Sequence, residues 1–178
     1  MPGIRADVDF LLWRIADSTD DFQAMSAEIN RSMLGCYLTT PHSFLSMTKR
    51  SIYVDKHVHV EQEGRRLKIQ PGLSKYLFIY PFVKTRDWYL LSAEERQEMM
   101  NHHIEVGHKF PRVKLNTTYS FGLDDQDFVV AFETDFPEDF LDLVMALRET
   151  KGSKFTQRDT PIFTCVQKDL RDILVSLG

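Results

Sequence analysis

The stretch KYLFIYPFVKTRDWYLLSAEERQEMMNHHIEVGHK, residues 75–109, decides how this chain is expected to fold. It opens with a strongly apolar and aromatic run, Lys75–Val83, whose composition predicts a buried β-strand. A long helix is predicted over Ser92–Lys109, because Ser92 precedes Glu95 by three residues, the spacing of a capping box. The stretch therefore predicts a buried strand followed by a helix with a defined start.

The residues after this stretch continue the alternation of strands and helices. Val113–Phe121 and Asp127–Thr134 are expected to be strands, and the turn residues GLDDQ between them indicate a hairpin. A helix is predicted over Pro137–Thr150, since proline suits a first helical turn and Gly152 follows the end. A last strand over Thr160–Gln167 and a short terminal helix complete the series. The order from residue 75 onward is βαββαβ, a ferredoxin-like unit.

The earlier residues resemble part of a second such unit. A strand is predicted over Val8–Ala16 and an amphipathic helix over Ser18–Leu34. A second strand is expected over Cys36–Lys49, and the polar residues Ser51–Ser74, with their glycines and proline, predict a loop or short linker.

Together these elements predict an α+β protein of the dimeric α+β barrel type. Residues 75–178 form the complete C-terminal ferredoxin-like half, and residues 1–74 form a partial N-terminal half with its linker. Between a sheet and its helices, such a fold can hold a large flat ligand.

Composition excludes several classes of function. The 178 residues are 43% hydrophobic and 27% charged, which is typical of a soluble globular protein, and the net charge of −4 argues against a nucleic-acid partner. No apolar run approaches the roughly 20 residues that a membrane span needs, and residues 1–10 lack the apolar core of a secretory signal. Cys36 and Cys165 are isolated and form neither a zinc motif nor a disulfide framework, so we expect a reducing cytoplasm.

A local excess of positive charge precedes the predicted helix. Between residues 65 and 86 there are six basic residues and no acidic one; they are Arg65, Arg66, Lys68, Lys75, Lys84 and Arg86. Such a run is often only a solvated face. It can also bind carboxylates or phosphates, with which arginine and lysine pair strongly.

His103 lies on the apolar stripe of the predicted helix, with Met99, Val106 and Phe110 at spacings of three and four. A lone histidine in such a stripe is more often a core residue than a ligand. Gly107, one turn later, favours the second possibility, because a glycine within a helix leaves a gap in which a large ligand can approach the backbone.

Tyr80 and Lys84 are four residues apart on the predicted strand and therefore share a face. The simplest interpretation of Tyr80 is an aromatic core residue. A tyrosine beside cations can instead be oxidised, or can donate a hydrogen bond to a carboxylate.

The residues in these motifs resemble the chlorite dismutase/coproheme decarboxylase family of haem proteins. The similarity is carried by RLKIQPGLSKYLFIYPFVKTRDWYLLSAEERQEMMNHHIEVGHKF (residues 66–110) and NTTYSFGLDDQDFVVAF (residues 116–132), and extends from about Ala6 to Thr164. The shared motifs are a Tyr-Pro-x-x-Lys strand, an Asp-Trp-Tyr run, a helical histidine with glycine four residues later, and Gly-x-Asp-Asp before a strand.

The resemblance implies that His103 is the proximal iron ligand and that Asn116, thirteen residues later, is the distal residue. Chlorite dismutases have an arginine at the distal position, whereas the decarboxylases have a neutral amide, so Asn116 favours decarboxylation. The resemblance also implies a radical-forming Tyr80, a proton-donating Lys84, and propionate-binding roles for Arg66 and Thr160.

The activity implied is decarboxylation of iron coproporphyrin III (coproheme), which is both substrate and cofactor. Hydrogen peroxide oxidises the iron, a tyrosyl radical at Tyr80 abstracts hydrogen from a propionate, and carbon dioxide leaves a vinyl group; two rounds give haem b. The alternatives are a chlorite dismutase or a haem-binding protein without catalysis. The family also implies a homo-oligomer, commonly a pentamer.

Three departures from the family bear on these expectations. We expect the chain to begin inside the N-terminal part of the decarboxylases, so that its first half-barrel is incomplete or completed by a partner. Lys151 and Gly152 stand where some relatives have a carboxylate that supports the proximal histidine. His42 stands near the position where decarboxylases offer a tyrosine.

Overall fold

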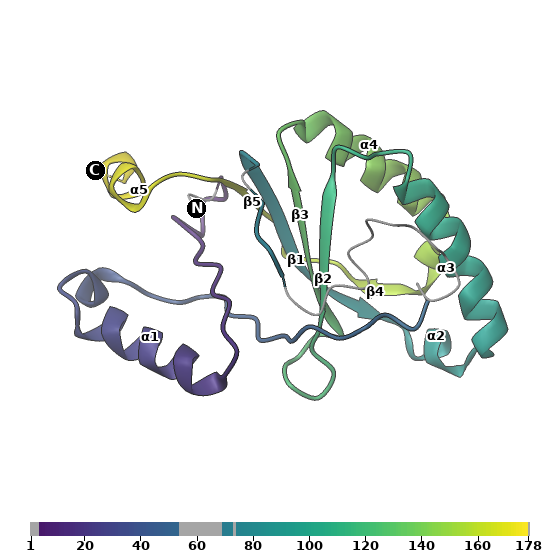
Figure 1. Ribbon diagram of the computed structural model, residues 1–178, viewed down its shortest axis with the longest axis horizontal. Coiled ribbons are helices and arrows are strands. Elements are labelled where there is room, and N and C mark those ends of the chain that lie inside the picture. Colours follow the sequence, from purple (N-terminus) through teal and green to yellow (C-terminus); the bar gives the residue numbers. More distant parts are fainter. Residues whose placement is uncertain (1–3, 54–68, 73, 178) are drawn as a thin grey trace.

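The computed structural model describes residues 4–53, 69–72 and 74–177. These residues form an α+β fold around a five-stranded antiparallel sheet (Figure 1). The strands are β1 (Tyr76–Lys84), β2 (Lys114–Tyr119), β3 (Phe128–Thr134), β4 (Thr156–Arg158) and β5 (Phe163–Val166).

The sheet has the strand order of a ferredoxin-like unit. β1 pairs with β3 along one edge, and β3 pairs with β2. The other edge of β1 pairs with β5 over Tyr76–Ile79 and with β4 at Val83 and Lys84. Because β4 and β5 follow one another along the same edge, the order βαββαβ is confirmed, with its last strand in two pieces.

The helices begin where the sequence predicts. α3 (Ala93–Gly107) has the predicted capping box between Ser92 and Glu95, and α4 (Pro137–Arg148) has proline in its first turn. α1 (Thr19–Arg31) is capped by Ser18. The remaining helical elements are α2 (Arg86–Leu90), α5 (Leu170–Ser176) and the 3₁₀ turns Leu34–Tyr37 and Lys151–Phe155.

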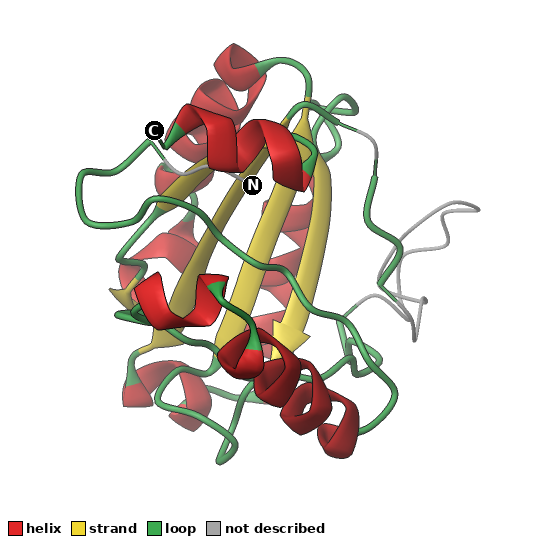
Figure 2. Ribbon diagram, turned by 90° about the vertical axis from the view of Figure 1, so that its left-hand side faces the viewer, coloured by secondary structure: helices red, strands yellow, loops and turns green. Residues whose placement is uncertain are grey.

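The two faces of the sheet carry separate apolar clusters. On one side, Leu77, Ile79, Val129 and Ala131 pack against the N-terminal segment; we call this the N-terminal face. On the other, Phe78, Tyr80, Val130 and Phe132 pack against α4; we call this the helix face. Figure 1 shows α3 and α4 together on the helix face, and Figure 2 shows the sheet from the opposite side with these helices behind it.

The two strands predicted in the N-terminal part are wrong. Val8–Ala16 is irregular and forms no strand. Cys36–Lys49 begins in a 3₁₀ turn and pairs with the sheet at the isolated bridge from Met47 to Tyr119. A strand needs a partner along its whole length, whereas here the apolar side chains of Val8, Leu11, Trp13 and Phe44 cover the N-terminal face. The division into halves at residue 74 stays a prediction.

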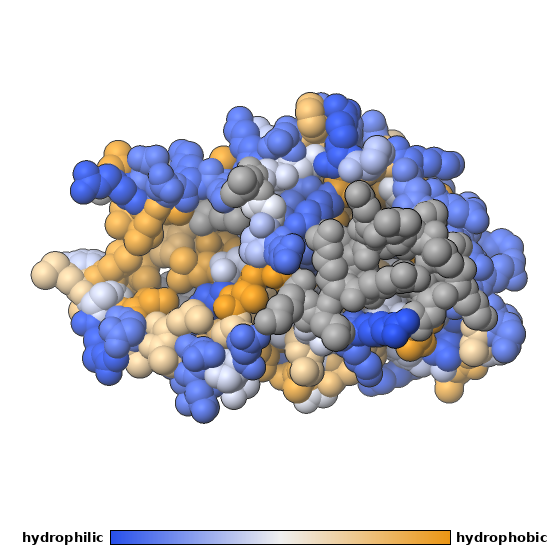
Figure 3. Space-filling view, in the orientation of Figure 1, coloured by the Kyte–Doolittle hydropathy of each residue, from blue (hydrophilic) through white to orange (hydrophobic). Residues whose placement is uncertain are grey.

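The part of the molecule that contains α1 and α5 carries much exposed apolar surface. Figure 3 shows apolar side chains gathered around the hollow between these helices. Exposed apolar residues of the N-terminal segment and α5 are Leu12, Ile15, Leu170, Leu174, Val175 and Leu177. Among the described helices, none is long and apolar enough to cross a bilayer. Cys36 is exposed, Cys165 is buried, and both are free thiols.

Candidate functional site

The predicted gap beside His103 is present on α3. His103 is half-buried, and Gly107 follows one turn later on the same side of the helix. A Cβ atom added at Gly107 would meet no atom within 4 Å. The space at Gly107 is therefore open, and a ligand beside His103 in that space stays a prediction.

The surroundings of His103 keep its imidazole neutral. Burial, and then the charges of Lys84 and His102, lower the pKa of His103 to about 4. A neutral imidazole has a free nitrogen lone pair, which a metal ion requires of a histidine ligand.

Lys84 brings an ammonium group into the same layer. Its Nζ donates a hydrogen bond to the Gly152 carbonyl oxygen at 2.8 Å and lies 4.5 Å from the centre of the Trp88 ring. Burial lowers the pKa of Lys84 to about 8. Gly152 stands where some relatives are expected to have a carboxylate that supports the proximal histidine. In this chain the backbone carbonyl at that position accepts a hydrogen bond from Lys84.

Tyr80 lies on the helix face and is 8% exposed. Its ring stacks on Phe132, with centroids 6.0 Å apart. Burial and the charge of Asp159 raise the pKa of Tyr80, while Arg148 acts in the opposite direction. These two charged residues form an ion pair of 3.4 Å. The phenol therefore keeps its proton, in a site where water has little access.

Asn116 is placed on the opposite side of the sheet, which corrects the predicted role. It pairs with Ala131 of the N-terminal face, whereas Tyr80 pairs with Val130 of the helix face. Its Nδ2 donates to the Glu133 carboxylate at 2.8 Å, and Glu133 also accepts from the Gly72 amide. The register of β2 thus directs this amide into a closed polar cluster, away from His103.

The structure describes two of the three remaining sequence candidates. Thr160 lies exposed in the connection from β4 to β5, and Arg66 falls outside the described residues. His42 packs edge-on against Phe163, which belongs to the N-terminal face, with 5.1 Å between ring centres. Two described members of the basic run, Lys75 and Lys84, do not share one surface, since they stand at opposite ends of β1, about 30 Å apart at the usual rise per residue.

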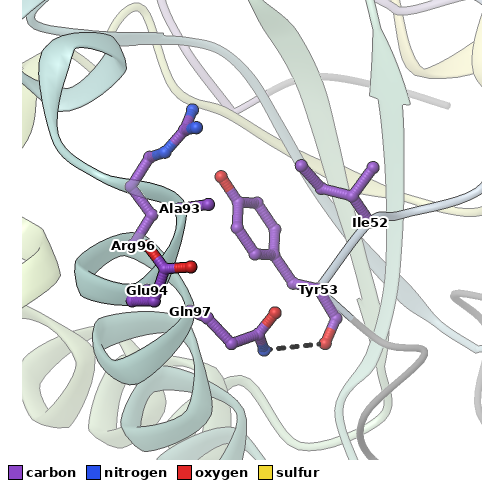
Figure 4. Close-up of a pocket in the computed structure, with 6 residues that line it drawn as sticks. All are labelled: Ile52, Tyr53, Ala93, Glu94, Arg96 and Gln97. Carbon is purple, nitrogen blue, oxygen red and sulfur yellow. Dashed lines mark hydrogen bonds between the residues drawn. The ribbon is translucent and has the colours of Figure 1, made fainter.

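Sequence reasoning assigned no role to three further residues, which are Trp88, Tyr53 and Arg96. Trp88 is 3% exposed and contacts both Lys84 and Tyr53, with 6.5 Å between the two aromatic ring centres. Tyr53 and Arg96 line a pocket of about 230 Å³ at the start of α3 (Figure 4). A signal for Arg96 was available, because it precedes His103 by seven residues, which is two helical turns.

These features fit an iron porphyrin. His103 offers one neutral nitrogen ligand, and Gly107 leaves space for a flat group beside it. In the described part of the chain, no group of three His, Cys, Asp or Glu side chains could hold a metal ion, so an iron at His103 would take its other ligands from the bound group. Lys84 and Arg96 could attract the carboxylates of that group.

Comparison with known proteins identifies the family. The family model described as chlorite dismutase matches residues 1–168. The chain belongs to the chlorite dismutase family.

Two relatives of this chain carry the name coproheme decarboxylase. The protein of Mycolicibacterium smegmatis is 30% identical over 176 residues, covering 98% of this chain and 74% of the relative. The protein of Staphylococcus carnosus is 29% identical over 157 residues, covering 82% of this chain and 62% of the relative. The chain thus spans less than the full length of both relatives.

Two solved structures share the fold of this chain. A chlorite dismutase from Candidatus Nitrospira defluvii in complex with imidazole is 28% identical with a TM-score of 0.78, covering 90% of this chain and 68% of that one. A haem-binding protein from Thermus thermophilus is 25% identical with a TM-score of 0.82, covering 99% of this chain and 73% of that one. These similarities confirm the predicted α+β, ferredoxin-like class.

Proposed function

We propose that this protein is a peroxide-dependent coproheme decarboxylase. Two observations support the proposal: Tyr80 is buried on the helix face, and the charge of Lys84 acts on the imidazole of His103. The relative from Mycolicibacterium smegmatis, similar over 98% of this chain, supports the choice of substrate. The Asn116 amide does not support the proposal, because Asn116 lies on the N-terminal face of the sheet.

The reaction removes one propionate carboxylate at a time. For each arm, a propionate, one hydrogen peroxide and one proton give a vinyl group, carbon dioxide and two water molecules. The bound iron porphyrin supplies both the propionate and the metal at which peroxide is reduced. Two such rounds convert coproheme to haem b.

Three side chains of this protein have assigned parts in the proposal. His103 provides the nitrogen that holds the iron. Tyr80 gives up its hydroxyl hydrogen and then takes one from the propionate arm, and its burial keeps water away from that exchange. Lys84, with a pKa of about 8, is mostly protonated at neutral pH and can supply the proton that peroxide reduction consumes.

The proposal includes an assembly and a location. We infer a homo-oligomer, a pentamer by resemblance to the family, and the exposed apolar residues near α1 and α5 support association with further copies. We infer a cytoplasmic location from the two free thiols. Native mass spectrometry of the purified protein tests the assembly, and a monomer at micromolar concentration would contradict it.

The activity is tested with ferric coproporphyrin III and hydrogen peroxide, followed by chromatography of the porphyrins. The wild-type protein should yield haem b. The Tyr80→Phe variant should bind coproheme and yield none, while Tyr37→Phe, at a tyrosine that is 81% exposed, should react like the wild type. Turnover by Tyr80→Phe at the wild-type rate would remove the radical role.

Binding is tested separately with His103→Ala, which should lose the absorption bands of the ligated iron. If neither coproheme nor haem b binds the wild-type protein, His103 is a core residue and the proposed function fails. Release of oxygen from chlorite, with no decarboxylation, would assign the protein to the dismutase reaction instead.

A further inference from the structure

Arg96 lies on the same stripe of α3 as His103. Seven residues separate them, which corresponds to a rotation of about 20° and a rise of about 10 Å along the helix. Gly107 stands on this stripe at the other side of His103. A flat group held by His103 would lie along the helix surface, between the open space at Gly107 and the side chain of Arg96.

The guanidinium of Arg96 has a buried nitrogen without a partner. Its Nε is inaccessible to solvent and makes no hydrogen bond to the described part of the chain. Buried polar atoms are nearly always paired, so an unpaired one indicates a partner that is brought by something else. Glu94 lines the same pocket, but no ion pair joins it to Arg96 among the described residues.

The pocket around Arg96 has two different ends (Figure 4). At one end the amide nitrogen of Gln97 is satisfied, since Nε2 donates to the Tyr53 carbonyl at 3.1 Å and to Asn101 Oδ1 at 2.7 Å. At the other end the guanidinium of Arg96 and the hydroxyl of Tyr53 extend in the same direction. This end therefore offers an unused cationic donor beside a phenol.

A chain of ring contacts connects this end of the pocket to Lys84. The Tyr53 ring lies 6.5 Å from the Trp88 ring, and Lys84 Nζ lies 4.5 Å from the centre of Trp88. Arg96 thus lies on the helix that carries His103, and it lines a pocket whose Tyr53 reaches Lys84 through the Trp88 ring.

We propose that Arg96, assisted by the Tyr53 hydroxyl, binds a carboxylate of the porphyrin held by His103. The planar guanidinium fits a carboxylate through two parallel hydrogen bonds, and a half-buried position strengthens such a pair. The inference rests on the porphyrin binding of the proposed function, and it names a propionate contact that does not depend on Arg66 or Thr160.

The test compares two ligands in two proteins. Wild type and Arg96→Met are titrated with ferric coproporphyrin III and with its tetramethyl ester in detergent, and binding is followed by absorbance. Loss of a charged hydrogen bond should weaken binding of the acid about tenfold or more. Binding of the ester should be the same in both proteins, because it has no carboxylate for Arg96 to bind.

Two controls separate a binding role from a structural one. Arg31→Met removes an exposed arginine paired with Glu28 on α1, and should leave both titrations unchanged. The ligand-free Arg96→Met protein should melt at or above the wild-type temperature, because the substitution removes a buried donor that has no partner among the described residues.

The possible outcomes are distinct. Equal loss of affinity for the acid and the ester, or a lowered melting temperature without ligand, would make Arg96 a structural residue and overturn the inference. Tight binding of acetate with unchanged coproheme affinity would overturn it in favour of a small free carboxylate. If Arg96→Met weakens binding of the acid but the wild type forms no haem b, the inference stands and the proposed decarboxylation fails. If the wild type forms haem b and Arg96→Met leaves binding of the acid unchanged, the decarboxylation stands and the inference fails.

Discussion

Replacing Gly107 by a larger residue should raise the stability of the ligand-free protein and weaken its binding of the porphyrin. A Cβ added at this position meets no atom within 4 Å, and the backbone of Gly107 is helical. Alanine and leucine both favour a helix over glycine by up to about 1 kcal/mol. For a chain of 178 residues, 1 kcal/mol corresponds to a rise of about 2–4 °C in melting temperature.

The same substitution should obstruct the porphyrin. In Gly107→Leu, the new side chain occupies the space that we assign to the macrocycle beside His103. Forcing extra methylene groups into a filled site costs about 1–3 kcal/mol, which corresponds to a loss of affinity of roughly 5- to 150-fold. Gly107→Ala adds one methyl group and should lie between the wild type and Gly107→Leu.

The assay consists of a thermal melt of the ligand-free protein and an absorbance titration with coproheme. Glu105→Leu is the matched control, since Glu105 is an exposed residue of the same helix, and its change to leucine should leave the titration unaffected. Wild-type affinity in Gly107→Leu would refute the placement of the porphyrin over this stripe. A lowered melting temperature without ligand would show that the space is filled.

Three further predictions concern residues around the site. Asn116→Ala removes a donor to the buried Glu133 carboxylate and should lower the free energy of unfolding by about 1–3 kcal/mol in urea, with coproheme binding unchanged because Asn116 lies on the N-terminal face. A change in binding would contradict that placement. Lys84 has a folded-state pKa of about 8 against its usual 10.5, so the unfolded chain binds more protons between these values; stability should rise with pH across this range, and Lys84→Met should flatten the rise. Ser92→Ala breaks the capping box with Glu95 and should cost about 1 kcal/mol in urea, and no loss would mean that water replaces the cap.

Elements specified by short-range interactions were predictable from the sequence. The start of α3 follows from Ser92 and Glu95, whose reciprocal hydrogen bonds span three residues. The strand β1 follows from an apolar run that is buried on both faces, and the hairpin of β2 and β3 from its turn residues. The position of Gly107 was also predictable, because a spacing of four residues on a helix puts it on the same side as His103.

Properties that depend on distant residues were not predictable. Val8–Ala16 has the composition of a strand, but pairing requires a free edge, and the structure uses its apolar side chains to cover a sheet face instead. The side on which Asn116 lies is set by the register of β2 against β3, where a shift of one residue would exchange the faces.

The sequence by itself determined the ferredoxin-like order of elements and the stripe that carries His103, since helix caps, apolar runs and turn residues act over a few positions. The tertiary structure alone decided which candidates share a face. It buried Tyr80 on the helix face and turned Asn116 to the N-terminal face, and it left a buried nitrogen of Arg96 unpaired among the described residues. The physical reason is that strand register and burial depend on contacts between residues far apart in the chain, which local patterns do not encode.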